Sequence, residues 1–332
     1  MSDQQERIRL GHGGGGTLMQ ELIDQEFRRL YSDPDQVLHD AARLDFPPGP
    51  LAFTTDSYVV HPLEFPGGDI GQLAITGTAN DLAMAGARPS RISVAMILEE
   101  GLELACLRRI VASMARAADA CGVAIVTGDT KVVERGKADR LFLTTSGVGV
   151  IESAHPIGPG AIQVGDQLLV SGDLGRHGLA ILAARHGLSL EPPLESDCMP
   201  LWPQVEACLL AGIRFHCLRD LTRGGLASAL QELARAAEAE LHLEEERVPV
   251  ATAVATACEI LGFEPLHLAN EGRFLAVVPP EHRALAEALL AEQGGCWIGE
   301  VREGSARVVL RTRYGSERLL LPPTGELLPR IC

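Results

Sequence analysis

The chain has 332 residues and a mass of 35.4 kDa, which corresponds to about two domains at roughly 150 residues each. Hydrophobic residues make up 46% of the sequence, so a core of ordinary size is available and disorder is excluded as the main state. The formal net charge of −15 argues against nucleic acid or a membrane surface as partner, because both are anionic. Aromatic residues, at 4%, offer no platform for stacking bases or sugars.

No apolar run approaches the roughly 18 residues that a membrane helix needs, and the first residues carry no apolar stretch typical of a signal peptide. We therefore expect a cytoplasmic protein with reduced thiols. The eight cysteines include no C-x-x-C pair, so neither a disulfide framework nor a structural zinc site is indicated. Seven of them are expected to be small core residues. The eighth, Cys332, is the last residue of the sequence.

The first half of the chain alternates predicted helices and strands. We expect no core element from residues 1–16, which are polar and then glycine-rich. After them, hydrophobic spacing predicts a helix over 17–31, a strand over 51–60, a helix over 70–87, a strand over 90–98, a helix over 103–120, and strands over 123–128 and 140–150. Strands and helices in such alternation are typical of a layered α/β or α+β domain.

A stretch rich in glycine and proline, 151–165, predicts a domain boundary. Beyond it the pattern predicts strands at 167–170 and 274–278, helices at 178–185, 201–211, 225–237 and 281–293, and short strands up to 321. Three prolines exclude a helix or central strand from the final eleven residues, which could span up to roughly 35–40 Å when extended. The expected division is a leader with a helix (1–40), an N-terminal domain (41–155), a C-terminal α/β domain (156–321) and a mobile tail (322–332).

Glycines 11–16 satisfy G-x-G-x-x-G and precede a predicted helix. A dinucleotide site would also need a following strand in a short βαβ unit, which is missing, and a P-loop would need Lys-Ser/Thr after the glycines. Two interpretations stay open. The bare backbone N–H groups could bind an anion, or the segment could be a disordered leader.

Three aspartates interrupt apolar elements: Asp56 in a strand, Asp81 in a helix, and Asp129 at the end of a strand. Each alone would be an ordinary cap or turn residue. Together with Lys131, which could meet a phosphate, they favour a site for Mg²⁺ and a nucleoside triphosphate, because buried carboxylates need a cation or a partner.

Other polar residues give weaker signals. We interpret Asp173 and Asp220 as turn residues, whereas Glu271, in a strand-like segment next to a glycine, is either a general base or part of a surface bulge. The three histidines at 12, 177 and 216 form no ligand pattern.

Seven segments together resemble the HypE family of carbamoyl dehydratases, which act in NiFe-hydrogenase maturation and belong to the aminoimidazole-ribonucleotide-synthetase (PurM-like) superfamily. The matching segments are GHGGGG, TTDSYVVHPLEFPGGDIGQLAITGTANDLAMAGA, VTGDTKVV, SGDLGRHG, DLTRGGLA, ANEG and the terminal PRIC. They extend from residue 11 to residue 332, so the resemblance covers nearly the whole sequence. PRIC is the most specific of them, because related enzymes of the superfamily lack it.

The resemblance implies a role for each matching residue. ATP would be bound by Gly13, Gly14, Gly15, Gly16, Asp56, Asp81, Asp129 and Thr130, and Mg²⁺ by Asp56, Asp81 and Asp129. Lys131 and Glu271 would act on a carboxamide carried by Cys332. The implied fold is a two-domain PurM-like fold, with an N-terminal sheet domain that dimerises and a C-terminal α/β domain followed by a tail.

The implied activity is the ATP-dependent dehydration of a carbamoyl group on Cys332, from S-carboxamide to thiocyanate, which supplies cyanide for the iron centre of the hydrogenase. The resemblance implies ATP and Mg²⁺ as cofactors and a homodimer as the working form. It also implies two partners, the carbamoyl transferase HypF and a HypC–HypD complex that accepts the cyano group.

Two alternatives stay open at this point. The chain could be another enzyme of the superfamily, such as a ribonucleotide cyclo-ligase, a thiamine-phosphate kinase or a selenophosphate synthetase. The last of these would need a reactive Cys or Sec near its N-terminus, and residues 1–30 contain none. Alternatively, the chain could be a non-catalytic scaffold whose cysteine tail docks partners.

Overall fold

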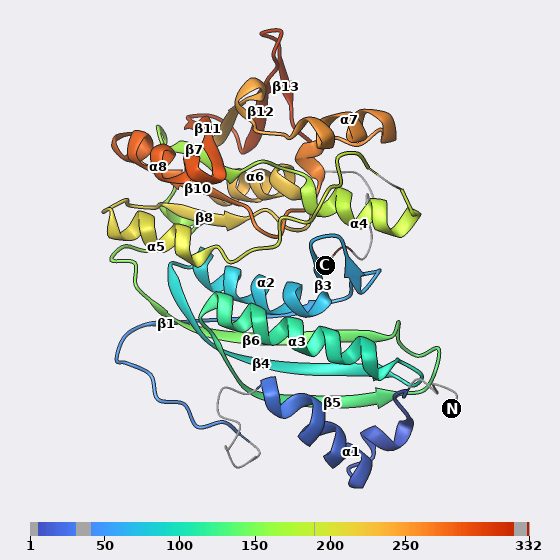
Figure 1. Ribbon diagram of the computed structural model, residues 1–332. Coiled ribbons are helices and arrows are strands. Elements are labelled where there is room, and N and C mark those ends of the chain that lie inside the picture. The colour runs from blue at the N-terminus through green and yellow to red at the C-terminus, as the bar shows by residue number, and fades with distance from the viewer. Residues whose placement is uncertain (1–5, 31–40, 189, 322–330, 332) are drawn as a thin grey trace.

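The computed structural model describes residues 6–30, 41–188, 190–321 and Ile331. It confirms the expected fold class: helices and strands form a mixed α/β protein built around two large sheets (Figure 1). Most of the predicted tail (322–330) and Cys332 lie outside the described residues.

The first sheet has four strands in the order β1-β6-β4-β5. Their bounds are β1 Leu51–Tyr58, β4 Ala87–Glu99, β5 Ala124–Val133 and β6 Leu141–Ile151. β4 and β5 are parallel, and the other pairs are antiparallel. Helices α2 (Ile70–Met84) and α3 (Leu104–Cys121) lie on one face of this sheet, between it and the second sheet (Figure 1). α2 begins at Asp69, whose carboxylate accepts from the N–H groups of Gly71 and Gln72 at 2.7 and 3.0 Å.

The other face of the first sheet is here called the open face. Because side chains alternate along a strand, the open face presents every second residue of each strand. It carries Phe53, which is 72% exposed, together with the exposed side chains of Leu51 and Ile97. An apolar face of this kind is typical of an interaction surface.

A β-bulge sets the orientation of the outer strand β5. Ile92 pairs with Ile125, but the next residue, Ser93, pairs with Thr127, so β5 contains one extra residue. Beyond the bulge, Thr130 is buried, while Asp129 and Lys131 are exposed opposite Ala95 and Ile97. Asp129 and Lys131 therefore lie on the open face.

The beginning of the chain differs from the expectation. Ile8 is buried in the N-terminal core and exchanges backbone hydrogen bonds with Leu102 and Gly101, so residues 1–16 do contribute a core residue. The predicted helix over 17–31 is α1 (Thr17–Leu22), which continues as a π turn (Ile23–Phe27) and a 3₁₀ turn (Arg28–Leu30). Leu22, Phe27 and Leu30 of this segment are buried in the same core.

The second sheet has seven strands in the order β13-β12-β9-β11-β7-β10-β8, and all neighbours are antiparallel except β12 and β9. The strands are β7 Gln167–Gly172, β8 Cys217–Asp220, β9 Glu240–Glu244, β10 Phe274–Val278, β11 Gly294–Arg302, β12 Arg307–Arg311 and β13 Glu317–Leu319. The helices are α4 Arg176–His186, α5 Trp202–Leu210, α6 Gly225–Ala236, α7 Thr252–Leu261 and α8 Arg283–Leu290. α6 packs on one face, and α5 and α8 pack on the other.

Some predicted elements have other bounds, and some elements were not predicted. β5 does not end at Gly128 but runs to Val133, because parallel pairing with β4 continues past the glycine, so Asp129 lies within the strand. β8, β9 and α7 were missed. β8 and β9 are short, and in α7 two threonines, a valine and an isoleucine, which have low helix propensity, stand among three alanines. The short hairpin β2 (Glu64–Phe65) and β3 (Gly68–Asp69) also escaped prediction.

The seven cysteines within the described residues are all free, and six of them are buried, as expected for small core residues. In the part of the chain that the structure describes, no helix is long and apolar enough to cross a bilayer.

The packing of α6 on the second sheet gives a stability prediction. Leu230 on α6 is fully buried, so Leu230→Ala should lower the free energy of unfolding by about 2–5 kcal/mol through lost contacts and a cavity. Leu210→Ala on α5 is the control, because Leu210 is 83% exposed and its truncation should cost no more than about 0.5 kcal/mol. Urea unfolding followed by the fluorescence of Trp202 and Trp297 would measure both. Equal losses in the two variants would contradict this account of the core.

Candidate active site

Carboxylates from both halves of the chain gather where α2 meets the second sheet. Asp81 on α2 accepts a hydrogen bond of 2.7 Å from the Thr54 hydroxyl of β1. Burial raises the pKa of Asp81 to about 6, and the negative charges of Asp220 and Asp56 add to this effect. Burial likewise raises the pKa of Asp220, the last residue of β8, with a contribution from Asp56. Asp220 is therefore part of an acidic site and not simply a turn residue.

Glu271 lies in the segment just before β10 and is only 3% exposed, which rules out a surface bulge. Burial raises its pKa well above the usual value, and Asp220, Asp197, Asp56 and Asp81 raise it further. Its Oε1 has no hydrogen-bond partner, and its backbone N–H donates to Asp197 Oδ1 at 3.2 Å. Such a carboxyl group has the elevated pKa that a general base near neutral pH requires.

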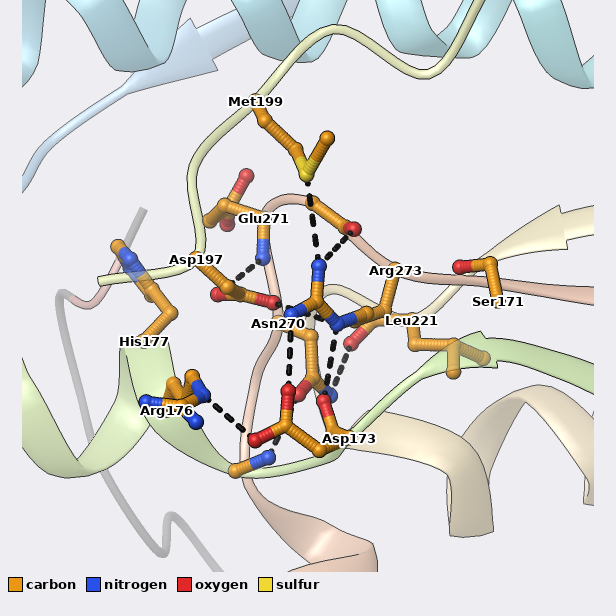
Figure 2. Close-up of polar contacts among 12 residues, drawn as sticks. Ser171, Asp173, Arg176, His177, Asp197, Met199, Leu221, Asn270, Glu271 and Arg273 are labelled. Carbon is orange, nitrogen blue, oxygen red and sulfur yellow. Dashed lines mark hydrogen bonds and ion pairs between the residues drawn. The ribbon is translucent and has the colours of Figure 1, made fainter. Parts of the chain in front are cut away.

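A network around Arg273 fixes the segment that carries Glu271 (Figure 2). The Arg273 guanidinium donates to the carboxylate and the carbonyl of Asp173 at 2.8 and 3.0 Å, and to Gly272 O at 2.8 Å. Arg176 donates to the other carboxylate oxygen of Asp173 at 2.5 Å. Asp173, predicted to be a turn residue, thus joins two arginines in a charged network. No side chain fits at position 272, because a Cβ there would lie 2.6 Å from Met199 Cγ and overlap the carbonyl of Asp197.

Two buried asparagines complete the support of this segment. Asn270 accepts from Gly175 N–H at 2.6 Å and donates to the carbonyls of Leu221 and Leu268. Asn80, one residue before Asp81 on α2, donates to the carbonyls of Met199 and Glu271 at 3.1 and 3.2 Å. Because Asn80 binds the backbone of Glu271 and is next to Asp81 in sequence, α2 fixes the position of Asp81 relative to Glu271.

Asp129 and Lys131 lie elsewhere, on the open face of the first sheet. The Lys131 ammonium is 2.9 and 2.8 Å from the two carboxylate oxygens of Asp129 and lowers the pKa of that group. Thr130, which lies between Asp129 and Lys131 in sequence, is buried. Its backbone N–H donates to Asp129 Oδ1 at 2.9 Å. Within one copy, the sheet separates Asp129 from Asp81, so the three predicted metal ligands do not form a single cluster.

The glycine loop lies beside β5, next to Val132, whose side chain points to the opposite face of the strand from Lys131. Gly13 lies against β5, where a Cβ would come within 2.9 Å of Val132 Cβ. Gly16 has open space around it, a Cβ at Gly14 would make an ordinary contact with Gly11 O at 3.6 Å, and Gly15 has a φ of +73°, which favours glycine. The loop thus approaches the strand of Lys131 closely while leaving its backbone accessible.

A metal ion would have to complete its coordination with ligands from outside the chain. Among the described residues, no group of three or more His, Cys, Asp or Glu side chains is arranged to hold a metal. However, the unpartnered Oε1 of Glu271 and the mutually repelling carboxylates of Asp81 and Asp220 fit a hard cation that also binds phosphate oxygens and water.

The comparisons with known proteins agree with this architecture. Family models described as AIR synthase related protein, N-terminal domain and C-terminal domain, match residues 38–151 and 163–311. The chain is 50% identical over 340 residues to carbamoyl dehydratase HypE of Rhodobacter capsulatus, and the match covers 100% of both chains. It belongs to the HypE family.

Solved structures of the HypE family superpose closely. One, of hydrogenase maturation protein HypE in complex with ATP, is 44% identical, covers 97% of this chain and 99% of its own, and gives a TM-score of 0.94. Another, a HypE–HypF complex, is 39% identical and covers 93% and 100%, with a TM-score of 0.80. The sequence resemblance to the HypE family and the two-domain PurM-like fold are therefore confirmed.

The raised pKa of Asp81 gives a prediction for stability without nucleotide or metal. Because its pKa of about 6 exceeds the usual 3.8, the folded state binds the proton more tightly, and the free energy of unfolding falls as pH rises from about 4 to about 6. Asp81→Asn loses no proton, so it should be more stable than the wild type by on the order of 2 kcal/mol at about pH 7.5 and equal to it near pH 4.

Urea unfolding at the two pH values measures this difference. Asp129→Asn is the matched control, because Lys131 lowers the pKa of Asp129 and no titration of that group falls in the window. A free energy of unfolding that rises from about pH 4 to about pH 6 in the wild type, but not in Asp81→Asn, would contradict the raised pKa of Asp81.

Proposed function

We propose that this chain catalyses the ATP-dependent dehydration of a carbamoyl group on the thiol of Cys332, converting the S-carboxamide to thiocyanate. Its membership of a family whose relatives are named carbamoyl dehydratase HypE supports this, as does the ATP bound in a 44% identical HypE structure. The structural observation that carries the proposal is the burial of Ile331, the residue before Cys332. Ile331 belongs to the same core cluster as Ala269, two residues from Glu271.

The proposed reaction balances in two steps. The carboxamide oxygen of S–CO–NH₂ attacks the γ-phosphorus of ATP, ADP leaves, and one N–H proton is lost, which gives S–C(=NH)–O–phosphate. A base then takes the second N–H proton, the C–O bond breaks and phosphate leaves, so that S–C≡N remains. ATP is needed because oxide is a poor leaving group, whereas phosphate is a good one. The thiocyanate can pass its cyano group onward, which would supply the cyanide of a NiFe-hydrogenase iron centre.

The residues divide the work by their chemistry. We assign Glu271 as the base, because its buried carboxyl has a raised pKa and a free oxygen. Lys131 and the backbone N–H groups of Gly13–Gly16, with Thr130 beside them, would bind phosphate oxygens. Mg²⁺, when bound, neutralises charge on the triphosphate, and Asp56, Asp81 and Asp129 would hold it, with Asp220 added from the structure.

Because Asp81 and Lys131 lie on opposite faces of the sheet, we propose that the active form is a homodimer packed through the open face. Leu51, Phe53 and Ile97 supply apolar surface for that contact. In a twofold dimer the same patch is used by both copies, so Asp129 and Lys131 of one copy approach the other. Residues 41–155 would then be the dimerising domain, and residues 156–321 the domain that carries Glu271.

Two partners follow from the reaction. The carbamoyl group must be loaded by a transferase, and a HypE–HypF complex 39% identical in its matched chain supports HypF in that role. The cyano group must be taken up by an iron-bearing acceptor, for which we propose the HypC–HypD complex. We further propose that the protein works in the cytoplasm.

Glu271→Gln should block the second step. Loss of the base predicts a fall of about 10²–10⁴-fold in the dehydration rate, while ATP binding persists. After loading by the carbamoyl transferase, intact mass should show no loss of one water, and the carbamoylated chain or its phosphorylated form should remain. Glu281→Gln, which changes an exposed glutamate beyond the other end of β10, is the control.

Cys332→Ala should bind ATP and fold like the wild type, yet show no mass change. ATP hydrolysis that does not respond to carbamoylation, with no water lost at Cys332, would instead favour the scaffold hypothesis.

Mixed dimers would test the shared site. Asp81→Asn and Lys131→Met change opposite faces of one sheet, so each homodimer should be inactive. If the site takes Asp81 from one copy and Lys131 from the other, a mixture of the two variants, unfolded and refolded together, should regain part of the dehydration activity. A mixture of Asp81→Asn with Glu271→Gln is the control and should not recover, because both residues belong to the cluster of one copy. Equal recovery in both mixtures would contradict a site divided in this way.

A further inference from the structure

The end of the described chain is docked at His177. Ile331 is 8% exposed and belongs to the N-terminal core cluster, together with Ile181 of α4, Cys198 and Ala269. Its carbonyl oxygen is 3.0 Å from Nε2 of His177, the second residue of α4. This hydrogen bond joins residues 154 positions apart in sequence.

The surroundings of His177 determine which of its nitrogens carries the proton. A carbonyl oxygen only accepts hydrogen bonds, so Nε2 must be the N–H that donates to Ile331. Nδ1 is 2.8 Å from the Ser196 hydroxyl and accepts from it, because burial lowers the pKa of the ring and keeps it neutral. Ser196 Oγ in turn accepts from Cys198 N–H at 3.2 Å. The three hydrogen bonds therefore form one series: Cys198 N–H donates to Ser196, Ser196 donates to His177, and His177 donates to the carbonyl of Ile331.

The ring of His177 is held rigidly by packing as well as by hydrogen bonds. Phe65, in the hairpin β2–β3, meets it edge to face, with centroids 5.5 Å apart and planes at 89°. Ser196 N–H donates to Pro66 O at 2.9 Å, which ties the segment 196–198 to the same hairpin. The donor therefore has a fixed direction.

One short segment connects this docking point to Glu271. Asp197, between Ser196 and Cys198, accepts from the backbone N–H of Glu271 at 3.2 Å. It also interacts electrostatically with both His177 and Glu271, and Figure 2 shows Asp197 between them. Segment 196–198 therefore contacts both His177, which holds Ile331, and Glu271, the residue assigned as the base.

We propose that His177 is a positioning residue for the dehydration, holding the carbonyl of Ile331 so that the group on the next residue, Cys332, is presented to Glu271. The proposal rests on the proposed function and adds to it the element that presents the substrate. His177 touches no reacting atom. It acts by raising the fraction of chains whose end is docked, and that fraction multiplies the rate of every later step.

Two substitutions separate the hydrogen bond from the packing. His177→Phe keeps a ring against Phe65 but has no donor, whereas His177→Gln keeps an N–H that can reach the carbonyl. In single-turnover reactions of the carbamoylated full-length protein with saturating ATP, His177→Phe should slow dehydration by roughly three- to tenfold, the effect of one hydrogen bond. His177→Gln should restore part of the rate. ATP affinity should be unchanged in both variants.

A second measurement detects undocking directly. Without its anchor, Cys332 should react faster with iodoacetamide, read from intact mass against the Cys332→Ala variant, which retains the other seven cysteines. His177→Phe should therefore raise the alkylation rate while it lowers the dehydration rate. Ser196→Ala, which removes the partner of Nδ1 without touching the ring, should shift both rates in the same directions, and it serves if His177→Phe does not fold.

The outcomes keep this proposal apart from the function. If the wild type itself loses no water from carbamoylated Cys332, the proposed function fails. Suppose instead that the wild type dehydrates. If His177→Phe and Ser196→Ala match its rate, or if they slow the reaction while the alkylation rate of Cys332 is unchanged, the function stands and the positioning role of His177 is wrong.

Discussion

Asp81, Asp220 and Glu271 come from α2, from the end of β8 and from the segment before β10. Burial raises the pKa of all three, and Asp220 further raises the pKa values of Asp81 and Glu271. Carboxylates brought together in partly desolvated surroundings repel one another, and only a rigid frame keeps them there. The frame is polar: Asn80, Asn270 and Arg273 donate hydrogen bonds to backbone carbonyls next to or within the acidic segments. Binding of a cation or a proton relieves the repulsion between the carboxylates. The arrangement therefore favours cation binding at the expense of the stability of the ligand-free protein.

The first sheet uses its two faces for different purposes. One face packs on α2 and α3 and carries Asp81 toward the second sheet, while the other carries Phe53, Asp129 and Lys131 to solvent. A nucleotide site that needs both groups cannot be complete within one copy. Under the proposed assignment, dimerisation would complete the active site and would not merely add stability.

Much of the fold could be predicted from the sequence, because strong hydrophobic periodicity marks long elements such as α3 and β6. Asp56 and Asp81 were recognisable as acids inside apolar elements. Asp220 was not, because an aspartate before Leu-Thr-Arg-Gly-Gly resembles a turn residue, and its role depends on the approach of α2 to β8. His177 gave no local signal either, since its partner Ile331 lies 154 positions away. Contacts of this kind arise from tertiary structure and leave no short motif.

The extra residue in β5 has a consequence for how such a protein can change. Val126 interrupts the pairing of β5 with β4, and every side chain that follows has its phase reversed. If Val126 were instead part of a regular strand without the bulge, alternation from the buried Ile125 would turn Lys131 inward beneath the helices and turn Thr130 outward. The bulge at Val126 thus decides which face of the sheet carries the charged group of Lys131. A relative of the same length that lacked the bulge would be expected to present the equivalent lysine on the opposite face of its sheet.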